Sequence, residues 1–349
     1  MRSFPSLLIC LLLRKTARLF KQPHVPSFWT GAPLPSMAPV PFFFAVSLKR
    51  TSTVSQMMRG PMAEHWSAQQ LAGALPPLNP LANKYIRGHL HVVAGCSRYP
   101  GAAALCAAAG QRAGAGYTSV ACSPEAVALV RAFRPSLVAS SWDDWNWNAV
   151  AAAPRHPAAA VVGPGFDGED DTCCRLALES LTEAATPLLL DGGALRALAT
   201  PYGLARAQAR GRAQRGPLVL TPHGGEAGAL ARATGIDDAS PAETAPALAR
   251  AFGAIVAVKG PTTFISDGQR LVEVNEGTAA LAKAGTGDVL AGIIGALLAQ
   301  GAEPFAAAVL GCTLHAWAGN SAAASHGLRS VVPEDVIEAL PDAFKQLEG

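Results

Sequence analysis

Short apolar segments alternate along the chain with longer, alanine-rich segments, and this alternation limits the folds that the chain can adopt. Segments with the composition of buried strands lie at 88–95, 117–121, 158–162, 187–190, 218–220, 255–258, 263–266 and 271–274. Segments of helical length and composition lie between several of them, at 102–114, 124–133 and 173–185. The pattern predicts an α/β fold with a mostly parallel central sheet and helices on both faces. Asp267-Gly268, between the last two strands, predicts a hairpin.

Charge is distributed unevenly along the 349 residues. Residues 1–63 contain eight Lys or Arg and no Asp or Glu, so the remainder has 20 basic and 25 acidic side chains. A mildly acidic domain argues against a nucleic-acid partner. None of its segments is long and apolar enough to predict a membrane span. The seven cysteines show no zinc-type spacing, and we expect buried free thiols.

The first 63 residues differ in composition from the rest, being basic, rich in proline and free of acidic side chains. Two explanations remain open. The tract is a mitochondrial transit peptide, or it precedes the true start, which would be Met57, Met58 or Met62. We favour the second, which predicts a cytoplasmic protein. In both cases we expect a non-globular extension at 1–63 and one domain at 64–349.

The segment 140–155 contains Trp142, Trp145 and Trp147 and is interpreted as a polar, aromatic loop. We expect these tryptophans to pack over the body of the domain, with a lid over a binding site as the alternative.

The most informative local sequence is Gly285-Thr286-Gly287-Asp288, which directly precedes the apolar segment 289–298. Glycines allow a tight turn, and a helix beginning there would present unpaired N–H groups and the positive end of its dipole to an anion. Asp288 would lie at the mouth of that site, where a carboxylate could take a proton from a hydroxyl group. The alternative is a glycine-rich loop in which Asp288 only caps the helix.

Five further motifs accompany this one in a fixed order. The six are AGCSRYPGAA (94–103), GPG (163–165), LDGGAL (190–195), LTPHGGE (220–226), VKGPTT (258–263) and AKAGTGD (282–288). Together they resemble the motifs of the ADP- or ATP-dependent NAD(P)H-hydrate dehydratases, a family of the ribokinase-like superfamily. The resemblance covers roughly residues 68–345 and includes LHAWAG (314–319).

The resemblance implies a reaction. In this family a nucleotide phosphoryl group converts the hydroxyl of a hydrated nicotinamide ring into a leaving group, and loss of phosphate restores NADH or NADPH. It implies the (S)-hydrate as substrate, ADP (giving AMP) or ATP as phosphoryl donor, and Mg²⁺. It also implies a homo-oligomer without the epimerase domain fused in many relatives, so that a separate NAD(P)H-hydrate epimerase is the expected partner.

The resemblance also implies residue roles. Asp288 is expected to be the catalytic base and to contact the hydrated ring. The expected substrate contacts besides Asp288 are Ala102, Gly165 and His223. The expected nucleotide contacts are Lys259, Gly260, Pro261, Thr262, Thr263, Gly285, Thr286 and Gly287. Glu226 is expected to hold Mg²⁺ through water, whereas His65, His156 and His326 are interpreted as surface residues.

Two other functions remain open from the sequence. A ribokinase-like kinase for a vitamin precursor would share the fold and the anion site but release a stable phosphorylated product. A non-enzymatic nucleotide-binding protein would not need Asp288, Lys259 and Glu226 together. The sequence leaves open whether ADP or ATP is the donor and whether NADH or NADPH is preferred.

Overall fold

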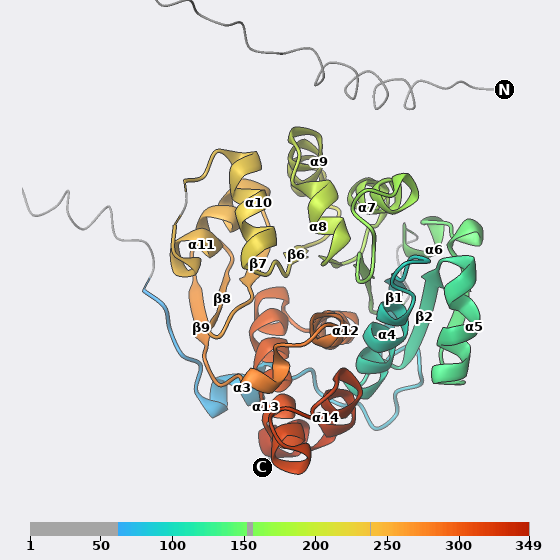
Figure 1. Ribbon diagram of the computed structural model, residues 1–349, viewed down its shortest axis with the longest axis vertical. Helices are drawn as coiled ribbons and strands as arrows, with labels where there is room; N and C mark the ends of the chain where they lie inside the picture. The colour runs from blue at the N-terminus through green and yellow to red at the C-terminus, as the bar shows by residue number, and fades with distance from the viewer. Residues whose placement is uncertain (1–61, 152–155, 238, 349) are drawn as a thin grey trace, which may run out of the picture. The chain divides into compact units, whose positions relative to one another are not determined.

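The computed structural model describes residues 62–151, 156–237 and 239–348. Nearly all of the predicted N-terminal extension therefore lies outside the described residues. Within these ranges nine strands form one sheet in the order β3-β2-β1-β4-β5-β6-β7-β8-β9 (Figure 1). The strands are β1 (His89–Val93), β2 (Tyr117–Cys122), β3 (Val138–Ser141), β4 (Ala158–Val162), β5 (Leu188–Leu190), β6 (Leu218–Leu220), β7 (Ile255–Val258), β8 (Thr263–Ser266) and β9 (Leu271–Val274).

The sheet is parallel from β3 to β7, and β8 and β9 add an antiparallel hairpin at one side. The prediction of a mostly parallel sheet with a final hairpin is confirmed. Its strands are short apolar runs because both faces are covered. Leu90 and Val92 of β1, for example, belong to one core cluster, whereas Val93 belongs to the cluster on the opposite face.

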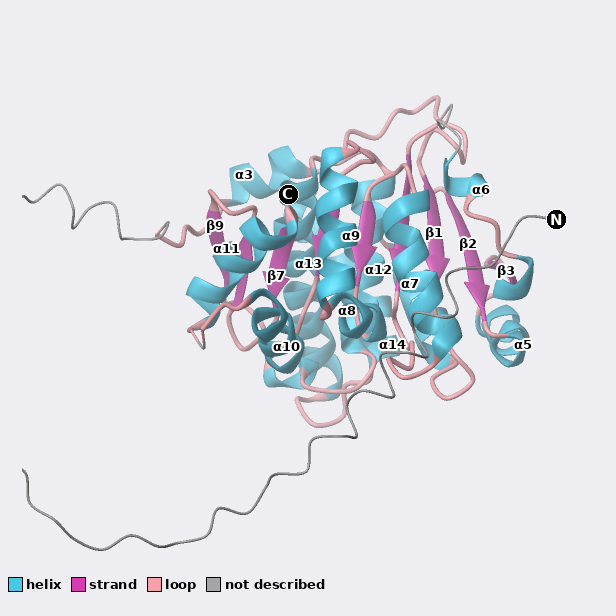
Figure 2. Cartoon of the chain, turned by 90° about the horizontal axis from the view of Figure 1, so that it is seen from above, coloured by secondary structure: helices cyan, strands magenta, loops and turns pink. Residues whose placement is uncertain are grey.

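Helices cover both faces of the sheet. The helices are α3 (Ala68–Ala74), α4 (Gly101–Arg112), α5 (Pro124–Phe133), α6 (Asn148–Ala151), α7 (Asp171–Glu183), α8 (Gly193–Leu198), α9 (Pro201–Arg212), α10 (Gly224–Thr234), α11 (Pro241–Phe252), α12 (Thr286–Ala299), α13 (Pro304–His326) and α14 (Pro333–Glu348). The core cluster on one face includes side chains of α4, α5, α12, α13 and α14, and that on the other face includes side chains of α7 to α11. Figures 1 and 2 show α7, α9 and α10 on the opposite side of the strands from α12, α13 and α14.

The helix α12 has the most central position of the described helices. It packs against α4, α13 and β4, and twelve of its residues are buried. A helix that is apolar on all sides has to be buried on all sides. The core of the domain therefore fixes the position of the residues at the start of α12.

Residues 140–151, the described part of the predicted loop 140–155, contain regular structure. The first of these residues end the edge strand β3, residues Trp142–Asp144 form a 3₁₀ turn, and α6 follows. Trp142 packs edge-on against Phe166, and Trp145 packs edge-on against Trp147. Because Trp142 and Trp147 are buried, the expectation that they pack over the body is confirmed.

The first described residues complete the opposite edge of the sheet. Glu64 pairs with β9, donating its backbone N–H to the Leu271 carbonyl and accepting from the N–H of Glu273, both at 2.9 Å. The helix α3 then packs against α13 and α14. This N-terminal segment therefore contacts elements from the last third of the chain.

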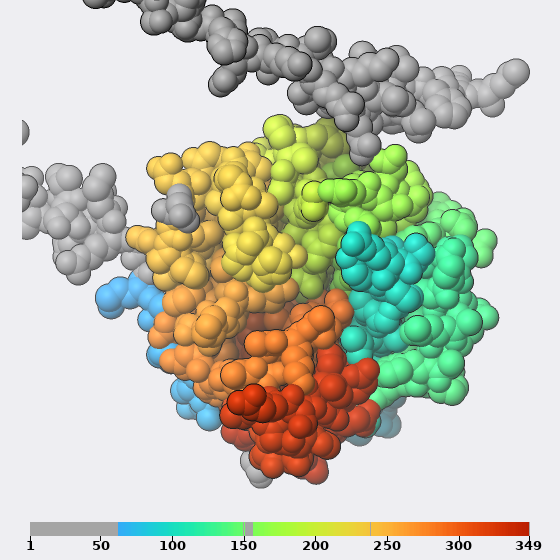
Figure 3. All heavy atoms as spheres, viewed as in Figure 1, coloured from blue at the N-terminus to red at the C-terminus, as the bar shows by residue number. Residues whose placement is uncertain are grey.

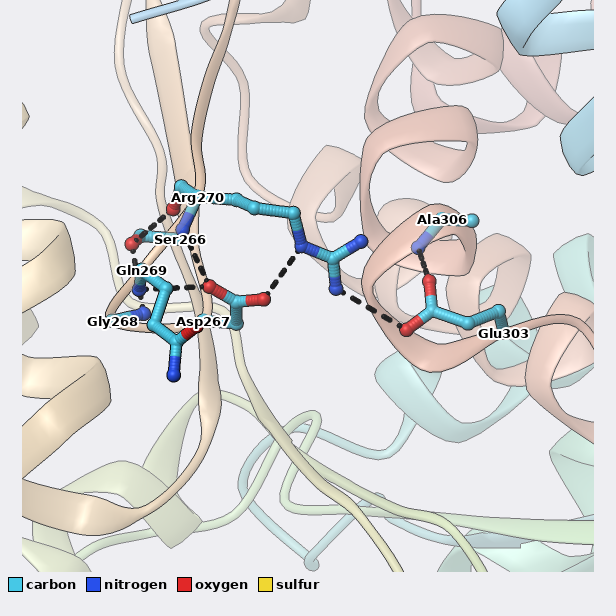
Figure 4. A network of polar contacts seen from close by, with 7 residues as sticks. All are labelled: Ser266, Asp267, Gly268, Gln269, Arg270, Glu303 and Ala306. Atoms are coloured by element: carbon cyan, nitrogen blue, oxygen red, sulfur yellow. Dashed lines mark hydrogen bonds and ion pairs between the residues drawn. The ribbon is translucent and has the colours of Figure 1, made fainter. Parts of the chain in front are cut away.

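A polar network joins the β8–β9 hairpin to the start of α13 (Figure 4). Arg270 lies between two carboxylates, with its Nε 2.7 Å from Asp267 and an Nη 3.4 Å from Glu303. Glu303 caps α13 by accepting the N–H of Ala306 at 2.8 Å, and the Arg270 guanidinium lies 4.0 Å above the ring of Phe305. The hairpin turn and α13 are thus held together at the surface.

Among the described residues, Cys96, Cys106, Cys122, Cys173 and Cys312 are buried free thiols, which agrees with the expected buried thiols. None of the helices that the structure describes combines the length and the apolar character needed to cross a membrane.

Candidate active site

Three polar side chains meet at the carboxyl ends of neighbouring strands. Asp191 follows β5, Thr221 follows β6 and Lys259 follows β7. The Nζ of Lys259 lies 2.6 Å from Asp191 Oδ1, and the Thr221 hydroxyl donates to the same oxygen at 2.8 Å. Asp191 is only 3% exposed. Open α/β sheets bind their ligands at this edge, and a buried ion pair there marks a candidate site.

The predicted glycine turn forms the start of α12. Gly285 is the residue before the helix and has φ +96°, which favours glycine. A Cβ at this position would lie 2.8 Å from Pro333 Cγ and 2.9 Å from Leu105 Cδ1. Glycine is therefore required at 285 for both backbone conformation and space.

Thr286 is held inside the turn. Its hydroxyl lies 2.8 Å from the carbonyl oxygens of both Leu281 and Lys283, and the residue is buried. The N–H groups of Gly287 and Asp288 belong to the first turn, where an α-helix provides no acceptor. An anion bound at this turn would thus meet backbone donors, whereas the hydroxyl of Thr286 is directed to the protein.

The glycine turn and the ion pair border the same space. A Cβ on Gly287 would lie 3.5 Å from Lys259 Nζ and 3.9 Å from Asp191 Oδ2. Burial raises the pKa of the Asp288 carboxyl from its ordinary 3.8 to about 7, and the negative charge of Asp191 adds to this, while Lys259 opposes it. Asp288 is therefore close to half ionised at neutral pH, as a general base should be.

His223 and Glu226 begin α10 as a reciprocal cap. The Nδ1 of His223 accepts the N–H groups of Gly225 at 3.0 Å and Glu226 at 3.4 Å, and Glu226 Oε2 accepts the N–H of His223 at 2.8 Å. Because Nδ1 is an acceptor here, a neutral His223 has its proton on Nε2. A backbone bridge to Lys259 brings this helix start to the ion pair.

Several carboxylates of the site lie near the ammonium group of Lys259, and the pKa values of Glu226 and Lys259 reflect this. Burial raises the pKa of Glu226, Lys259 opposes this, and Asp191 raises the pKa further. For Lys259, burial lowers the pKa, but the attraction of Asp191 and Glu226 outweighs burial and raises it. The carboxylates of Asp191, Glu226 and Asp288 thus all interact electrostatically with the Lys259 ammonium group.

Two predicted substrate positions contact each other. Gly165 has φ +64°, and a Cβ on it would lie 2.5 Å from Ala102 Cβ and 2.6 Å from the Tyr99 carbonyl oxygen. The close approach of α4 to the turn after β4 is therefore sufficient to require glycine at 165. The structure brings Gly165 and Ala102 together.

The remaining predicted nucleotide contacts follow β7. Gly260, Pro261 and Thr262 form the connection to β8, which begins at Thr263. Gly260 and Pro261 are exposed. On the face shown in Figure 3, α4 in teal, α10 in yellow and the orange segment leading into α12 come together, although they are far apart in the sequence. The predicted site residues are thus drawn from segments that share this face, but a nucleotide-binding role for them stays a prediction.

Sequence reasoning missed three residues of this site. Asp191 and Thr221 lie within the motifs LDGGAL and LTPHGGE but were given no role, although each directly follows a predicted strand. His315, within LHAWAG, lies buried on α13, where burial and the positive charge of Lys259 lower its pKa to about 4. Asp191 and Thr221 could have been identified as candidates because each directly follows a predicted strand.

A metal ion would need ligands from outside the protein. Across the described residues, no group of three or more His, Cys, Asp or Glu side chains could hold a metal ion. A single carboxylate such as Glu226 suits a hard cation such as Mg²⁺, which keeps several waters and binds phosphate oxygens.

Comparison with known proteins identifies relatives of the whole described domain. A family model of the NAD(P)H-hydrate dehydratases matches residues 90–342. The ADP-dependent (S)-NAD(P)H-hydrate dehydratase of Xanthomonas campestris is 32% identical over 303 residues, which cover 83% of this chain and 99% of that protein. Bifunctional NAD(P)H-hydrate repair enzymes also match, and the chain spans about half of their length.

Solved structures agree on the fold. An ADP/ATP-dependent NAD(P)H-hydrate dehydratase from Bacillus subtilis, co-crystallised with ATP and Mg²⁺, matches with a TM-score of 0.68 at 24% identity, covering 83% of this chain and 99% of that one. A ribokinase-like protein from Enterococcus faecalis matches with a TM-score of 0.69 at 22% identity, covering 82% and 96%. The predicted ribokinase-like α/β fold is thereby confirmed.

Proposed function

This chain belongs to the NAD(P)H-hydrate dehydratase family, and from that premise we propose that it dehydrates the (S)-hydrates of NADH and NADPH at the expense of ADP or ATP. The products would be NADH or NADPH, phosphate and the spent nucleotide, AMP where ADP is the donor. The observation that best supports this is the position of Asp288, a partly buried carboxylate with a pKa near 7 at the helix start formed by the glycine turn.

The first step is phosphoryl transfer to the hydrated ring. Asp288 accepts the proton of the ring hydroxyl as the hydroxyl oxygen bonds to phosphorus, and the bond from phosphorus to the nucleotide breaks. The N–H groups at the start of α12 stabilise the charge on the transferred group, because they are fixed donors at the positive end of a helix dipole. Positioning and electrostatics account for most catalysis of this kind.

The second step is elimination. Phosphate leaves with the electrons of its bond to the ring carbon, and the lone pair of the ring nitrogen assists. Loss of a proton from the neighbouring ring carbon restores the dihydropyridine. The nucleotide thus supplies the leaving group that hydroxide alone would not provide.

Lys259 is proposed to serve both the protein and the nucleotide. An ammonium group has three N–H donors, and Asp191 accepts one of them at 2.6 Å. A Cβ added to Gly287 would lie 3.5 Å from the same nitrogen, so a phosphoryl group at the glycine turn would be within its reach. The pair with Asp191 would then fix the direction of the remaining donors.

A polyanionic nucleotide at a site with three carboxylates needs additional positive charge. We propose Mg²⁺ as the accompanying ion, held by Glu226 through water and by the phosphates of the nucleotide. When bound, it would neutralise phosphate charge. Glu226 suits this role because it is partly buried, and binding of a cation would favour its ionised form. The cytoplasmic location, the homo-oligomer and the separate epimerase stay predictions.

The test is incubation of the purified protein with hydrated NADH and ADP, ATP or neither. We expect absorbance of the restored dihydropyridine to appear with a nucleotide only, together with one phosphate per molecule repaired. Asp144→Asn, a change at an exposed carboxylate, is the matched control for Asp288→Asn. A stable phosphorylated product without restored absorbance would identify a kinase instead.

A further inference from the structure

The lysine just before the glycine turn has no role in the mechanism above. Lys283 lies two residues before Gly285. Its Nζ donates one hydrogen bond to the carbonyl oxygen of Arg329 at 2.8 Å and another to the carbonyl oxygen of Val331. Both acceptors belong to residues 327–332, which connect α13 to α14. A side chain beside the site is thus bound to the backbone of the C-terminal part of the chain.

The same connection contacts the glycine turn at a second point. Pro333, the first residue of α14, is buried, and a Cβ on Gly285 would lie 2.8 Å from its Cγ. Val331 is also buried, with an exposed fraction of 0%. The glycine turn therefore packs against residues that directly follow the carbonyl groups held by Lys283.

The backbone of Lys283 takes part in the turn itself. Its carbonyl oxygen accepts the Thr286 hydroxyl at 2.8 Å and the Thr286 N–H at 3.4 Å. Gly285 and Gly287 flank Thr286, and glycine permits more backbone conformations than any other residue. The turn therefore needs contacts that select one conformation. Lys283 supplies such contacts at both ends, through its carbonyl group within the turn and through its ammonium group to the connection.

We propose that Lys283 is a positioning residue, which holds the glycine turn against residues 329–333 and thereby aims the N–H groups of Gly287 and Asp288 at the transferred phosphoryl group. The proposal rests on the proposed function. An ammonium group has three N–H donors, and carbonyl oxygens accept two of those of Lys283. The side chain therefore acts on the backbone that supports the turn, and it does not touch the substrate.

The contacts of Lys283 distinguish it from a solvated surface lysine. Its side chain is only partly exposed, and ordering a long, flexible side chain costs conformational entropy. Hydrogen bonds from a charged donor are stronger than neutral ones, so two of them offset that cost. Methionine has a similar length but no donor. At position 283 it would leave the carbonyl group of the buried Val331 without this partner, which is unfavourable.

The test separates the length of the side chain from its donors. Lys283→Met keeps an apolar stem and removes the donors, whereas Lys283→Arg keeps a cation with several N–H groups. Pro333→Ala shortens the second contact with the turn and leaves Lys283 in place. Lys345→Met is the matched control, because Lys345 lies on α14, its side chain is 77% exposed, and it pairs with Asp342 of the same helix. For each variant we would measure kcat and the KM values for hydrated NADH and ADP.

We expect Lys283→Met to lower kcat by about 10- to 100-fold, the scale of a small misplacement of catalytic groups, with both KM values within about threefold of wild type. Pro333→Ala should lower kcat by a smaller factor. Lys283→Arg and Lys345→Met should keep kcat within about threefold of wild type.

Three results would overturn the proposal. The first is a kcat of Lys283→Met equal to that of Lys345→Met, and the second is an arginine variant as slow as the methionine variant. The third is a KM for ADP that rises as much as kcat falls, since this would make Lys283 a direct nucleotide contact. If Lys283→Met does not fold, an unchanged kcat in Pro333→Ala contradicts the proposal and a lowered kcat supports it.

Failure of the proposed function would be distinguishable, because exchange of backbone amide hydrogens needs no reaction. The N–H groups of Thr286 and Val289 donate to the carbonyl groups of Lys283 and Gly285. They should exchange faster in Lys283→Met than in wild type, with the strands unchanged, and at the wild-type rate in Lys283→Arg. Unaltered exchange in Lys283→Met would contradict the positioning role. If the wild type binds ADP with Mg²⁺ but does not restore NADH, the proposed reaction is wrong, and amide exchange still decides the role of Lys283.

Discussion

Replacing Asp288 with asparagine should stop the reaction and stabilise the protein. Burial, assisted by Asp191, raises the pKa of Asp288 from 3.8 to about 7. The difference is about three pH units, and each unit corresponds to about 1.4 kcal/mol. The ionised carboxylate therefore destabilises the fold by up to about 4 kcal/mol, and asparagine, which is uncharged and similar in shape, would remove this term.

The sign of the effect sets its pH dependence. Between about pH 4 and pH 7 the folded protein retains the Asp288 proton while the unfolded chain has lost it, so the free energy of unfolding falls as the pH rises. Below about pH 4 both states are protonated and the term is absent. The gain in the asparagine variant should therefore be near zero at about pH 4 and reach its full size above about pH 7.

Urea unfolding of the apoprotein at about pH 4.5, 6 and 8.5 measures this gain. In parallel, turnover should fall by about a hundredfold or more, the effect of losing a general base, while nucleotide affinity is retained. Asp144→Asn, at an exposed position, should change neither quantity. A gain that does not grow with pH would refute the assignment of the raised pKa, and near-normal turnover would refute the role of Asp288 as base.

Three further predictions concern the site and the N-terminal tract. The ratio kcat/KM should rise about tenfold between about pH 6 and pH 8, as Asp288 ionises with a pKa near 7; a flat profile would contradict this. Lys259→Ala should weaken nucleotide binding by about 1–3 kcal/mol, with little change for the hydrated cofactor, as measured by calorimetry; equal losses for both ligands, or none for the nucleotide, would make Lys259 structural. Lys259→Ala also leaves Asp191 without its cation, so the free energy of unfolding of this variant should fall by about 3–5 kcal/mol. A chain starting at Met57 retains the pairing of Glu64 with β9 and should keep its melting temperature and activity; a clear loss of either would show that residues 1–56 contribute to the fold.

Most of the sheet could be predicted from the sequence because buried parallel strands are short apolar runs. β4 and β6 to β9 have the predicted bounds. The missed strand, β3, lies at the edge, where the sequence Val-Ala-Ser-Ser alternates between exposed and buried positions. Such a segment has neither the apolar run of a central strand nor the length that makes alternation recognisable.

The site was predictable where its chemistry is local. The glycine turn at the start of α12 is a property of four consecutive residues, and the structure has it where the sequence placed it. The ion pair of Asp191 and Lys259 joins residues 68 positions apart, so it depends on the order of β5, β6 and β7 in the sheet. The position of His315 beside the site likewise depends on the packing of α13 against α12, which the sequence does not specify.

The pairing of the first described residues with β9 has a consequence for protein synthesis. Among the described residues Glu64 and α3 leave the ribosome early, yet their partners β9, α13 and α14 begin roughly 200 to 270 residues later, a delay on the order of 10–50 s at ordinary rates of translation. During that time α3 has only its own cap, the reciprocal bonds between Ser67 and Gln70, to hold it. This early segment is therefore fixed late, and refolding followed by pulsed hydrogen exchange should show residues 64–74 acquiring protection after the parallel strands. Leu71, the residue of α3 that is buried in the folded domain, stays uncovered until the C-terminal helices are complete.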